Sequence, residues 1–258
     1  MRKTIGKLFL ILMLLVIYAP ILILAVYSFT DSGNIGSIHG FSMQNYVTLF
    51  TKGELRDMIV GTVLLALVSS LLATILGTLG AIGAFYSKKL AKNFINTANQ
   101  IPVVNADVVT GFSICVLLIV AFGMNKESYV PLLIGHVVLS APFVYLSVVP
   151  KLKQMDASLY EAAMDLGASP SMALRKVVIP QIMPGIVSGF ALAITLSLDD
   201  YFIASYTKPA TFNTISTYVV NATKGSQTEI KTALWALSTV IFLIVILAVV
   251  VMNEDGRK

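Results

Sequence analysis

Three aspartates, Asp107, Asp199 and Asp200, lie in segments that are otherwise apolar and long enough to cross a membrane. An ionisable side chain at membrane depth is costly and normally faces a cavity or a partner. No Lys or Arg occurs in any of the predicted spans, so the acids have no cationic partner there. If the fifth span starts at Pro184, Asp199 lies about 22 Å along it, in the outer half. Asp107 begins nearer the inner side, and acids at different depths suit a ladder for a crossing cation.

Aromatic side chains follow the acid pair. Tyr201 and Tyr206 beside carboxylates suit an organic cation through cation–π attraction, and they equally suit an aromatic belt at the membrane interface. Adjacent residues on a helix point about 100° apart, so Asp199 and Asp200 cannot line one narrow path equally well. One of them is therefore open to another role, either capping a helix break or pairing with a base on a partner subunit.

The composition indicates lipid as the natural solvent of the chain. Of 258 residues, 57% are hydrophobic and 12% are charged, whereas a soluble domain usually carries about 25% charged residues. A single cysteine, Cys115, excludes an intrachain disulfide and a cysteine-built metal cluster. With only two histidines, His39 and His136, no metal site is expected. The net charge of +5 comes from residues between the apolar segments, so membrane topology explains it better than nucleic-acid binding does.

Six apolar stretches reach or approach the length of about 20 residues that a membrane-spanning helix needs. They are Leu8 to Phe29, Ile59 to Tyr86, Ile101 to Gly123, Val130 to Val149, Pro184 to Tyr206, and Thr232 to Met252. The first run is too long for the core of a cleaved signal peptide and is interpreted as a retained helix. The prediction is an all-α integral membrane protein with six transmembrane helices in a single domain, residues 1–258.

Lys and Arg predict the orientation of the chain, because they concentrate in cytoplasmic segments. About two thirds of them fall on the same side as the N-terminus, in the segments before the first span and after the second, fourth and sixth. Both termini are therefore predicted to be cytoplasmic.

The long inner segment, residues 150–183, has the pattern of a short helix and a sharp turn. Asp156 to Leu166 is rich in alanine and has apolar residues three and four apart, which predicts a helix. Gly167 suits the end of that helix, since a left-handed conformation costs glycine little.

A second short helix is predicted directly after the turn. Ser169 fits its N-cap and Pro170 its first position. This helix is expected to run to about Val178, and Pro180 and Pro184 are expected to interrupt the chain before the fifth span.

This inner segment resembles the EAA loop of bacterial ABC-importer permeases. The residues that carry the resemblance are Glu161, Ala162 and Ala163, then Gly167, and the closing Val178-Ile179-Pro180. The resemblance implies that the segment is a coupling helix seated in a groove of an ATPase subunit. A surface amphipathic helix without a partner is the alternative; it would need a basic face opposite large apolar residues, whereas this segment offers small alanines and acids. No phosphate-binding G-x-x-x-x-G-K-S/T motif is present, so ATP and Mg²⁺ are expected on a separate partner chain, with no cofactor in this one.

Over nearly its whole length the chain resembles spermidine/putrescine ABC permeases of the PotC type. The stretches LSLDDYFIASY (Leu196 to Tyr206) and ADVVTGFSI (Ala106 to Ile114) carry this resemblance together with the EAA loop. The chain departs from the pattern at Asn105-Ala106, where a proline is expected just before the aspartate.

The resemblance implies a bacterial inner-membrane subunit of a polyamine importer. Its expected partners are a second, homologous permease subunit, two copies of an ABC ATPase, and an external polyamine-binding protein that docks on the outer loops.

Other readings stay open. An ABC permease for another small solute, such as iron or thiamine, shares the same architecture. A proton-coupled secondary transporter would explain the acids but not the EAA loop. An intramembrane hydrolase would need a nucleophile–base arrangement, and His136 is the only membrane histidine. The pattern does not choose between spermidine and putrescine, or between a homodimer and a pair of paralogues.

Overall fold

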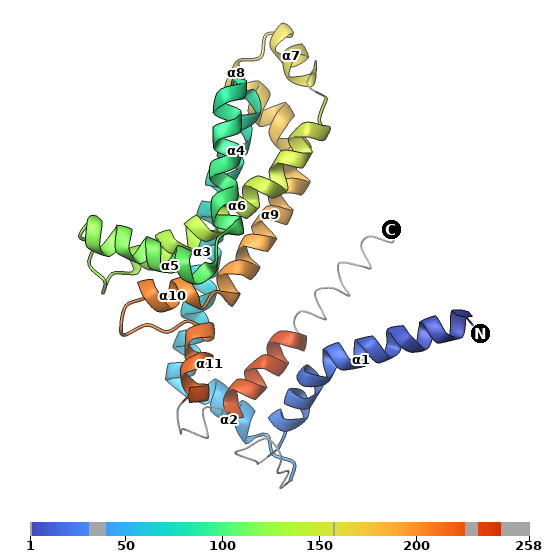
Figure 1. The fold of residues 1–258 in the computed structure, drawn as a ribbon, viewed down its shortest axis with the longest axis vertical. Coiled ribbons are helices and arrows are strands. Elements are labelled where there is room, and N and C mark those ends of the chain that lie inside the picture. The colour runs from blue at the N-terminus through green and yellow to red at the C-terminus, as the bar shows by residue number, and fades with distance from the viewer. Residues whose placement is uncertain (1, 31–39, 157, 225–231, 244–258) are drawn as a thin grey trace. The chain divides into compact units, whose positions relative to one another are not determined.

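The computed structural model describes residues 2–30, 40–156, 158–224 and 232–243, and most of these residues are helical (Figure 1). The elements are α1 (Arg2–Ser28), α2 (Gln44–Thr51), α3 (Gly53–Tyr86), α4 (Lys89–Val104), α5 (Asp107–Cys115), η1 (Val116–Ala121), α6 (Tyr129–Gln154), α7 (Ser158–Asp165), α8 (Pro170–Ala173), η2 (Leu174–Val178), α9 (Ile179–Asp199), α10 (Phe202–Thr207) and α11 (Ile215–Lys224). A further helix covers residues 232–243. Within the described ranges, β-structure is limited to an isolated bridge between Thr30 and Phe41.

Four described helices are long and apolar enough to cross a membrane: Gly6–Ser28, Gly53–Tyr86, Tyr129–Gln154 and Pro170–Asp199. The bent pair α4 and α5 makes a fifth if it is counted as one span. Of the predicted sixth span, residues 232–243 form a shorter apolar helix, and the rest lies outside the described residues.

The third span differs from the prediction of one helix over Ile101 to Gly123. Two helices meet at an angle of 108° between Val104 and Asp107. The first of them starts already at Lys89, so the break falls on Asn105-Ala106, where both residues are extended. Hydropathy averaged over a span-length window does not detect this break, because residues 101–114 are apolar apart from Asn105, Asp107 and two hydroxyl side chains.

The prediction that Pro180 and Pro184 interrupt the chain is also wrong. The backbone is helical without a gap from Pro170 to Asp199. A π-helical stretch, η2, ends at Val178, two residues before Pro180, and a π-turn at a proline accommodates the ring without ending the helix. The chain instead leaves the helix at Asp199, and α10 begins at Phe202, so the predicted fifth span to Tyr206 is two helices.

The chain forms two compact units, residues 1–57 with 218–258, and residues 58–217. In the first unit, the Asn45 side-chain amide of α2 donates to the backbone carbonyls of Ser28 and Thr30, at 3.0 and 3.1 Å. The Tyr27 ring of α1 meets the Trp235 ring edge-on at 5.7 Å. These contacts fix the end of α1 against α2 and the 232–243 helix.

The second unit is built on α3, α6 and α9, which pack through glycine. A Cβ on Gly77 of α3 would lie 2.7 Å from the carbonyl oxygen of Ala141 on α6, and a Cβ on Gly189 of α9 would lie 3.1 Å from the Cα of Val144. Between lipid-embedded helices, such close backbone approach is a main source of packing attraction. The buried core beside these contacts consists of Ala81, Ala84, Val144, Tyr145, Val148, Leu152, Val178, Ile182 and Ala193.

Candidate functional site

Asp200 sits at the break between α9 and α10 and caps the second helix. Its two carboxylate oxygens accept hydrogen bonds from the backbone N–H groups of Ile203, at 3.2 Å, and Ala204, at 2.8 Å. The side chain is buried, with 8% exposure of the residue. The first N–H groups of a helix have no partner within it, and Asp200 supplies acceptors for two of them. Asp200 therefore has the capping geometry that was one of the two alternatives for a member of the acid pair.

A buried polar network supports this break from three helices. His136 Nδ1 of α6 is 2.8 Å from Ser197 Oγ of α9, and that hydroxyl is 3.1 Å from Ser69 Oγ of α3. His136 Nε2 faces the Asp200 carboxylate at 3.6 Å without a hydrogen bond. All four side chains are buried. Ser69 and Ser197 carry no signal in the sequence that predicts this network, and His136 stands out there only as the lone histidine in a predicted span.

The short helix α10 is held against α5 and α6 by close contacts at glycine. A Cβ on Gly135 would lie 2.5 Å from Ile203 Cγ2, and one on Gly111 would lie 3.1 Å from Ile203 Cα. The Cys115 thiol of α5 also donates to the Tyr206 carbonyl at 3.3 Å. The break is therefore a packed feature of the fold, with the carboxylate of Asp200 at its start.

Asp199 lies at the same break as Asp200, and Asp107 lies at the break between α4 and α5. Asp107 is the first residue of α5, Asp199 is the last residue of α9, and both are exposed. The start of α5 packs against the start of α10 through Gly111 and Ile203, which brings Asp107 near Asp199 and Asp200. The difference in membrane depth between the acids stays a prediction. We call Asp107, Asp199 and Asp200 the acidic cluster.

Aromatic rings flank this acidic cluster. Tyr201 packs edge-on against Phe202 with ring centroids 5.3 Å apart, and Tyr206 meets Phe112 of α5 at 5.8 Å. Both tyrosines are half-buried. Tyr201 directly follows Asp200 in the chain, and Tyr206 lies on the helix that Asp200 caps. Aromatic faces near carboxylates suit the binding of organic cations.

The second candidate site is the turn between α7 and α8. Gly167 has φ +87°, a left-handed conformation that favours glycine. Its N–H donates to the Met164 carbonyl at 2.9 Å, and the Ala168 N–H donates to the Ala163 carbonyl at 3.0 Å. This pair of bonds is a Schellman motif, which closes the C-terminus of α7. The predicted helix, glycine turn and second helix are all present.

Side chains also cap the N-termini of the two helices around this turn. The Met172 N–H donates to Ser169 Oγ at 3.4 Å, as expected for an N-cap. The Ser158 N–H donates to Asp156 Oδ1 at 3.0 Å, and this bond lowers the pKa of the Asp156 carboxyl. Each cap fixes where its helix begins.

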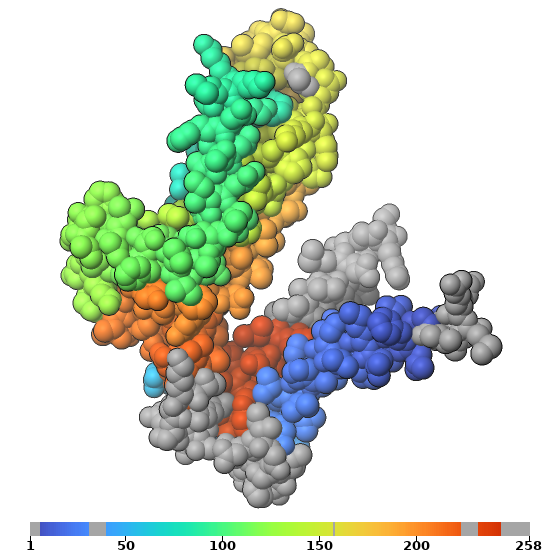
Figure 2. Space-filling view, viewed as in Figure 1, coloured from blue at the N-terminus to red at the C-terminus, as the bar shows by residue number. Residues whose placement is uncertain are grey.

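The α7 helix presents an open surface. None of its residues is buried; Glu161 and Ala162 are exposed and Ala163 is half-buried. Leu166, beside the glycine turn, is 89% exposed. The space-filling view shows α7 forming one end of the 58–217 unit (Figure 2). Pro180 lies apart from this surface, exposed in the first turn of α9.

Metal binding at the two sites depends on the side chains that could serve as ligands. Among the described residues, no group of three or more His, Cys, Asp or Glu side chains is placed to hold a metal ion. The acidic cluster is open at Asp107 and Asp199, so its chemistry suits a passing cation.

Apolar helices of spanning length, two bent helices with carboxylates at the bends, and an exposed helix–turn–helix at one end define a membrane transport subunit. Residues 76–254 match the family model described as binding-protein-dependent transport system inner membrane component. The chain belongs to this family. It is therefore a multi-pass protein of the bacterial inner membrane and works within an ABC transport system.

Relatives and solved structures agree with this assignment. The chain is 28% identical to the spermidine/putrescine transport system permease protein PotC of Escherichia coli (strain K12), over 94% of this chain and 91% of that protein. It is 32% identical to the putrescine transport system permease protein PotI of the same organism, over 87% and 81%. The fold is similar to that in the crystal structure of a bacterial ABC transporter involved in the import of alginate, with TM-score 0.74 and 18% identity, covering 100% of this chain and 96% of that one.

Proposed function

We propose that this chain is the permease subunit of an ATP-driven importer of polyamines, spermidine or putrescine. The assignment of polyamines as the cargo is supported by similarity to permeases of that substrate class over most of the chain, with 32% identity to PotI. Iron or thiamine would fit the same architecture, but no described feature favours them.

The acidic cluster supports a polycationic cargo. Asp107 and Asp199 offer exposed carboxylates, and Tyr201 and Tyr206 offer aromatic faces beside them. A linear polyamine carries separated ammonium groups, so a carboxylate at each of two helix bends can pair with two of them at once. Asp200 contributes by holding the bend and by adding negative charge.

The helix–turn–helix supports a role in coupling to an ATPase. We infer that Glu161, Ala162 and Ala163 bind in a groove of that partner. Gly167 fixes the angle between α7 and α8. Pro180 lies in the first turn of α9, where the coupling segment continues into the membrane-spanning helix. The uninterrupted helix from Pro170 to Asp199 then links the coupling surface to the acidic cluster. Movement of α7 by the partner would be transmitted along one rigid element.

The assembly proposed around this chain contains two ATPase copies, which bind ATP and Mg²⁺, a second homologous permease subunit and an external polyamine-binding protein. Within it, residues 1–258 form one permease domain with residues 150–183 as its coupling segment. Six spans with both termini cytoplasmic remain our prediction. They comprise the four long helices, the bent α4–α5 pair and the 232–243 helix with the residues after it.

Uptake of labelled spermidine and putrescine tests the cargo and the acidic cluster together. Cells that lack this gene would be complemented with the wild-type chain, with Asp107→Asn/Asp199→Asn, or with the control Asp57→Asn, at matched membrane levels. Asp57 is an exposed acid near the start of α3, away from both bends in the sequence. We expect uptake with wild type and Asp57→Asn, and a reduction of about tenfold or more in the double variant, because each ion pair contributes about 1 kcal/mol in a wet path.

Failure of the wild-type chain to restore uptake, with its partner subunits present, would move the cargo to another solute. Normal uptake by the double variant would instead show that Asp107 and Asp199 do not contact the cargo, while the assignment of polyamines as the cargo would stand.

A further inference from the structure

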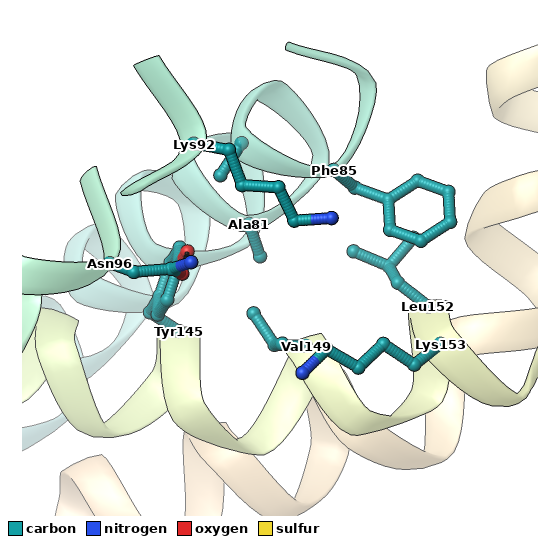
Figure 3. A pocket seen from close by; sticks show the side chains of 9 residues that line it. Ala81, Phe85, Lys92, Asn96, Tyr145, Val149, Leu152 and Lys153 are labelled. Carbon is teal, nitrogen blue, oxygen red and sulfur yellow. Dashed lines mark hydrogen bonds between the residues drawn. The ribbon is translucent and has the colours of Figure 1, made fainter. Parts of the chain in front are cut away.

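A pocket lies where the end of α3, the start of α4 and the end of α6 meet, in the 58–217 unit (Figure 3). Its lining residues are Ala81, Ala84, Phe85, Lys92, Asn96, Tyr145, Val149, Leu152 and Lys153. Tyr160 of α7 packs against the same core, which puts the pocket at the α7 end of this unit. The lining includes none of the residues proposed for the cargo path. Leu152 and Lys153 belong to the coupling segment, but to its α6 part, before α7 and the glycine turn.

One side of the pocket is apolar. Ala81 and Ala84 lie three residues apart on α3 and are almost fully buried, at 0% and 2% exposure. Leu152 of α6 is also fully buried, whereas Phe85 of α3 and Val149 of α6 are half-buried and present apolar surface to the pocket. This wall has the chemistry of the membrane interior.

The opposite side is polar and held in shape. The Tyr145 hydroxyl of α6 donates to Asn96 Oδ1 of α4, joining the two helices beside the pocket. Lys92 of α4 lies over the Phe85 ring, with its Nζ 5.4 Å from the ring centroid. Figure 3 shows the Lys92 and Lys153 side chains extending toward the same space from different helices.

These two lysines have no acidic partner within the described part of the chain, where the ion pairs involve other residues. Two ammonium groups that approach one space repel each other unless an anion lies between them. An anion with an apolar tail would satisfy both the lysines and the apolar wall. Phospholipid headgroups at the cytoplasmic surface have this chemistry, and basic pockets between membrane helices are known to hold them.

We propose that this pocket binds the phosphate of an anionic phospholipid, with Lys92 and Lys153 holding the phosphate and the half-buried Phe85 and Val149 contacting the apolar part of the lipid beside it. This site is independent of the cargo. It ties α4, and with it the bend before Asp107, to the membrane surface through a lipid.

Native mass spectrometry of the purified transporter with added phosphatidylglycerol tests the proposal. The wild-type complex is expected to retain phosphatidylglycerol in preference to phosphatidylcholine. Lys92→Gln/Lys153→Gln is expected to weaken retention by roughly tenfold or more, since each lysine near an anionic surface contributes a severalfold effect. The matched control is Lys88→Gln/Lys89→Gln, which removes the same charge from exposed residues around the start of α4, outside the pocket lining.

Three outcomes would overturn the site: unchanged retention in the pocket variant, equal loss in the control, or equal retention of both lipids by wild type. Inorganic phosphate serves as the second arm. If it displaces the lipid at comparable concentration, the pocket is a free-phosphate site and the lipid assignment is wrong. Because Lys153 is exposed, Lys153→Gln alone should leave the melting temperature unchanged and still weaken retention, which separates binding from folding.

Discussion

Replacing Gly167 with alanine isolates the backbone requirement of the turn between α7 and α8. A Cβ added at this position meets no atom within 4 Å, so the substitution causes no steric clash. Its whole effect comes from φ, which is +87° in a region that L-residues rarely adopt.

The cost of that conformation for an L-residue is about 1–2 kcal/mol. A chain that relaxes to avoid it loses the Gly167–Met164 and Ala168–Ala163 hydrogen bonds that close α7. Few contacts oppose such relaxation, since α7 has no buried residue. A free-energy change of this size shifts the ratio of native to alternative turns roughly 5- to 30-fold. The variant is therefore expected to remain in the membrane while α7 loses its fixed angle.

The assay is copurification of the ATPase with the permease at matched membrane levels, together with transport-coupled ATP hydrolysis. We expect both to fall in Gly167→Ala. The control is Gly83→Ala in α3, where a Cβ also meets nothing within 4 Å but the backbone is helical, so alanine is tolerated or slightly stabilising. If the two variants retain the ATPase and couple hydrolysis equally, the turn does not position a coupling helix and the reasoning fails.

Two further substitutions test what holds the helices in place. Asp200→Ala removes both acceptors of the α10 cap and should lower the stability of the fold by about 0.5–2 kcal/mol, measured as a lower melting temperature in detergent. Asp200→Asn keeps one acceptor and should lower the melting temperature less. Equal decreases in the two variants would argue against capping. Gly77→Ala places a Cβ 2.7 Å from the Ala141 carbonyl, so α3 and α6 must separate at a cost of about 1–3 kcal/mol; a melting temperature matching that of Gly83→Ala would show that the two backbones are not in close contact.

Local patterns in the sequence were sufficient for several elements. The helices at Leu8, Ile59 and Val130 follow from long apolar runs, which need no information from the rest of the chain. The glycine turn and the Ser169 cap follow from residues whose preference is set by their own backbone. For the same reason the helix predicted over Asp156 to Leu166 is close to the observed α7, Ser158–Asp165.

The candidate site was only partly within reach of the sequence. The sequence shows Asp107, Asp199 and Asp200 as acids in apolar segments. It does not show that two of them are exposed and that the third caps a helix. The Ser69–Ser197 hydrogen bond joins residues 128 positions apart, and serines within apolar helices are too common to suggest it.

What the sequence by itself determined is the solvent of the chain, the places where long helices form and the resemblance of its inner segment to a coupling loop, because hydropathy and turn preference are local properties. Only the tertiary structure decided where those helices bend. The 108° angle before Asp107 and the end of α9 at Asp199 lie within stretches whose average hydropathy is that of a continuous span. They depend on Gly111 and Gly135 giving room to Ile203, and on Asp200 supplying the acceptors that the new helix lacks. A bend inside a membrane persists only where neighbouring helices and side chains satisfy the freed backbone groups.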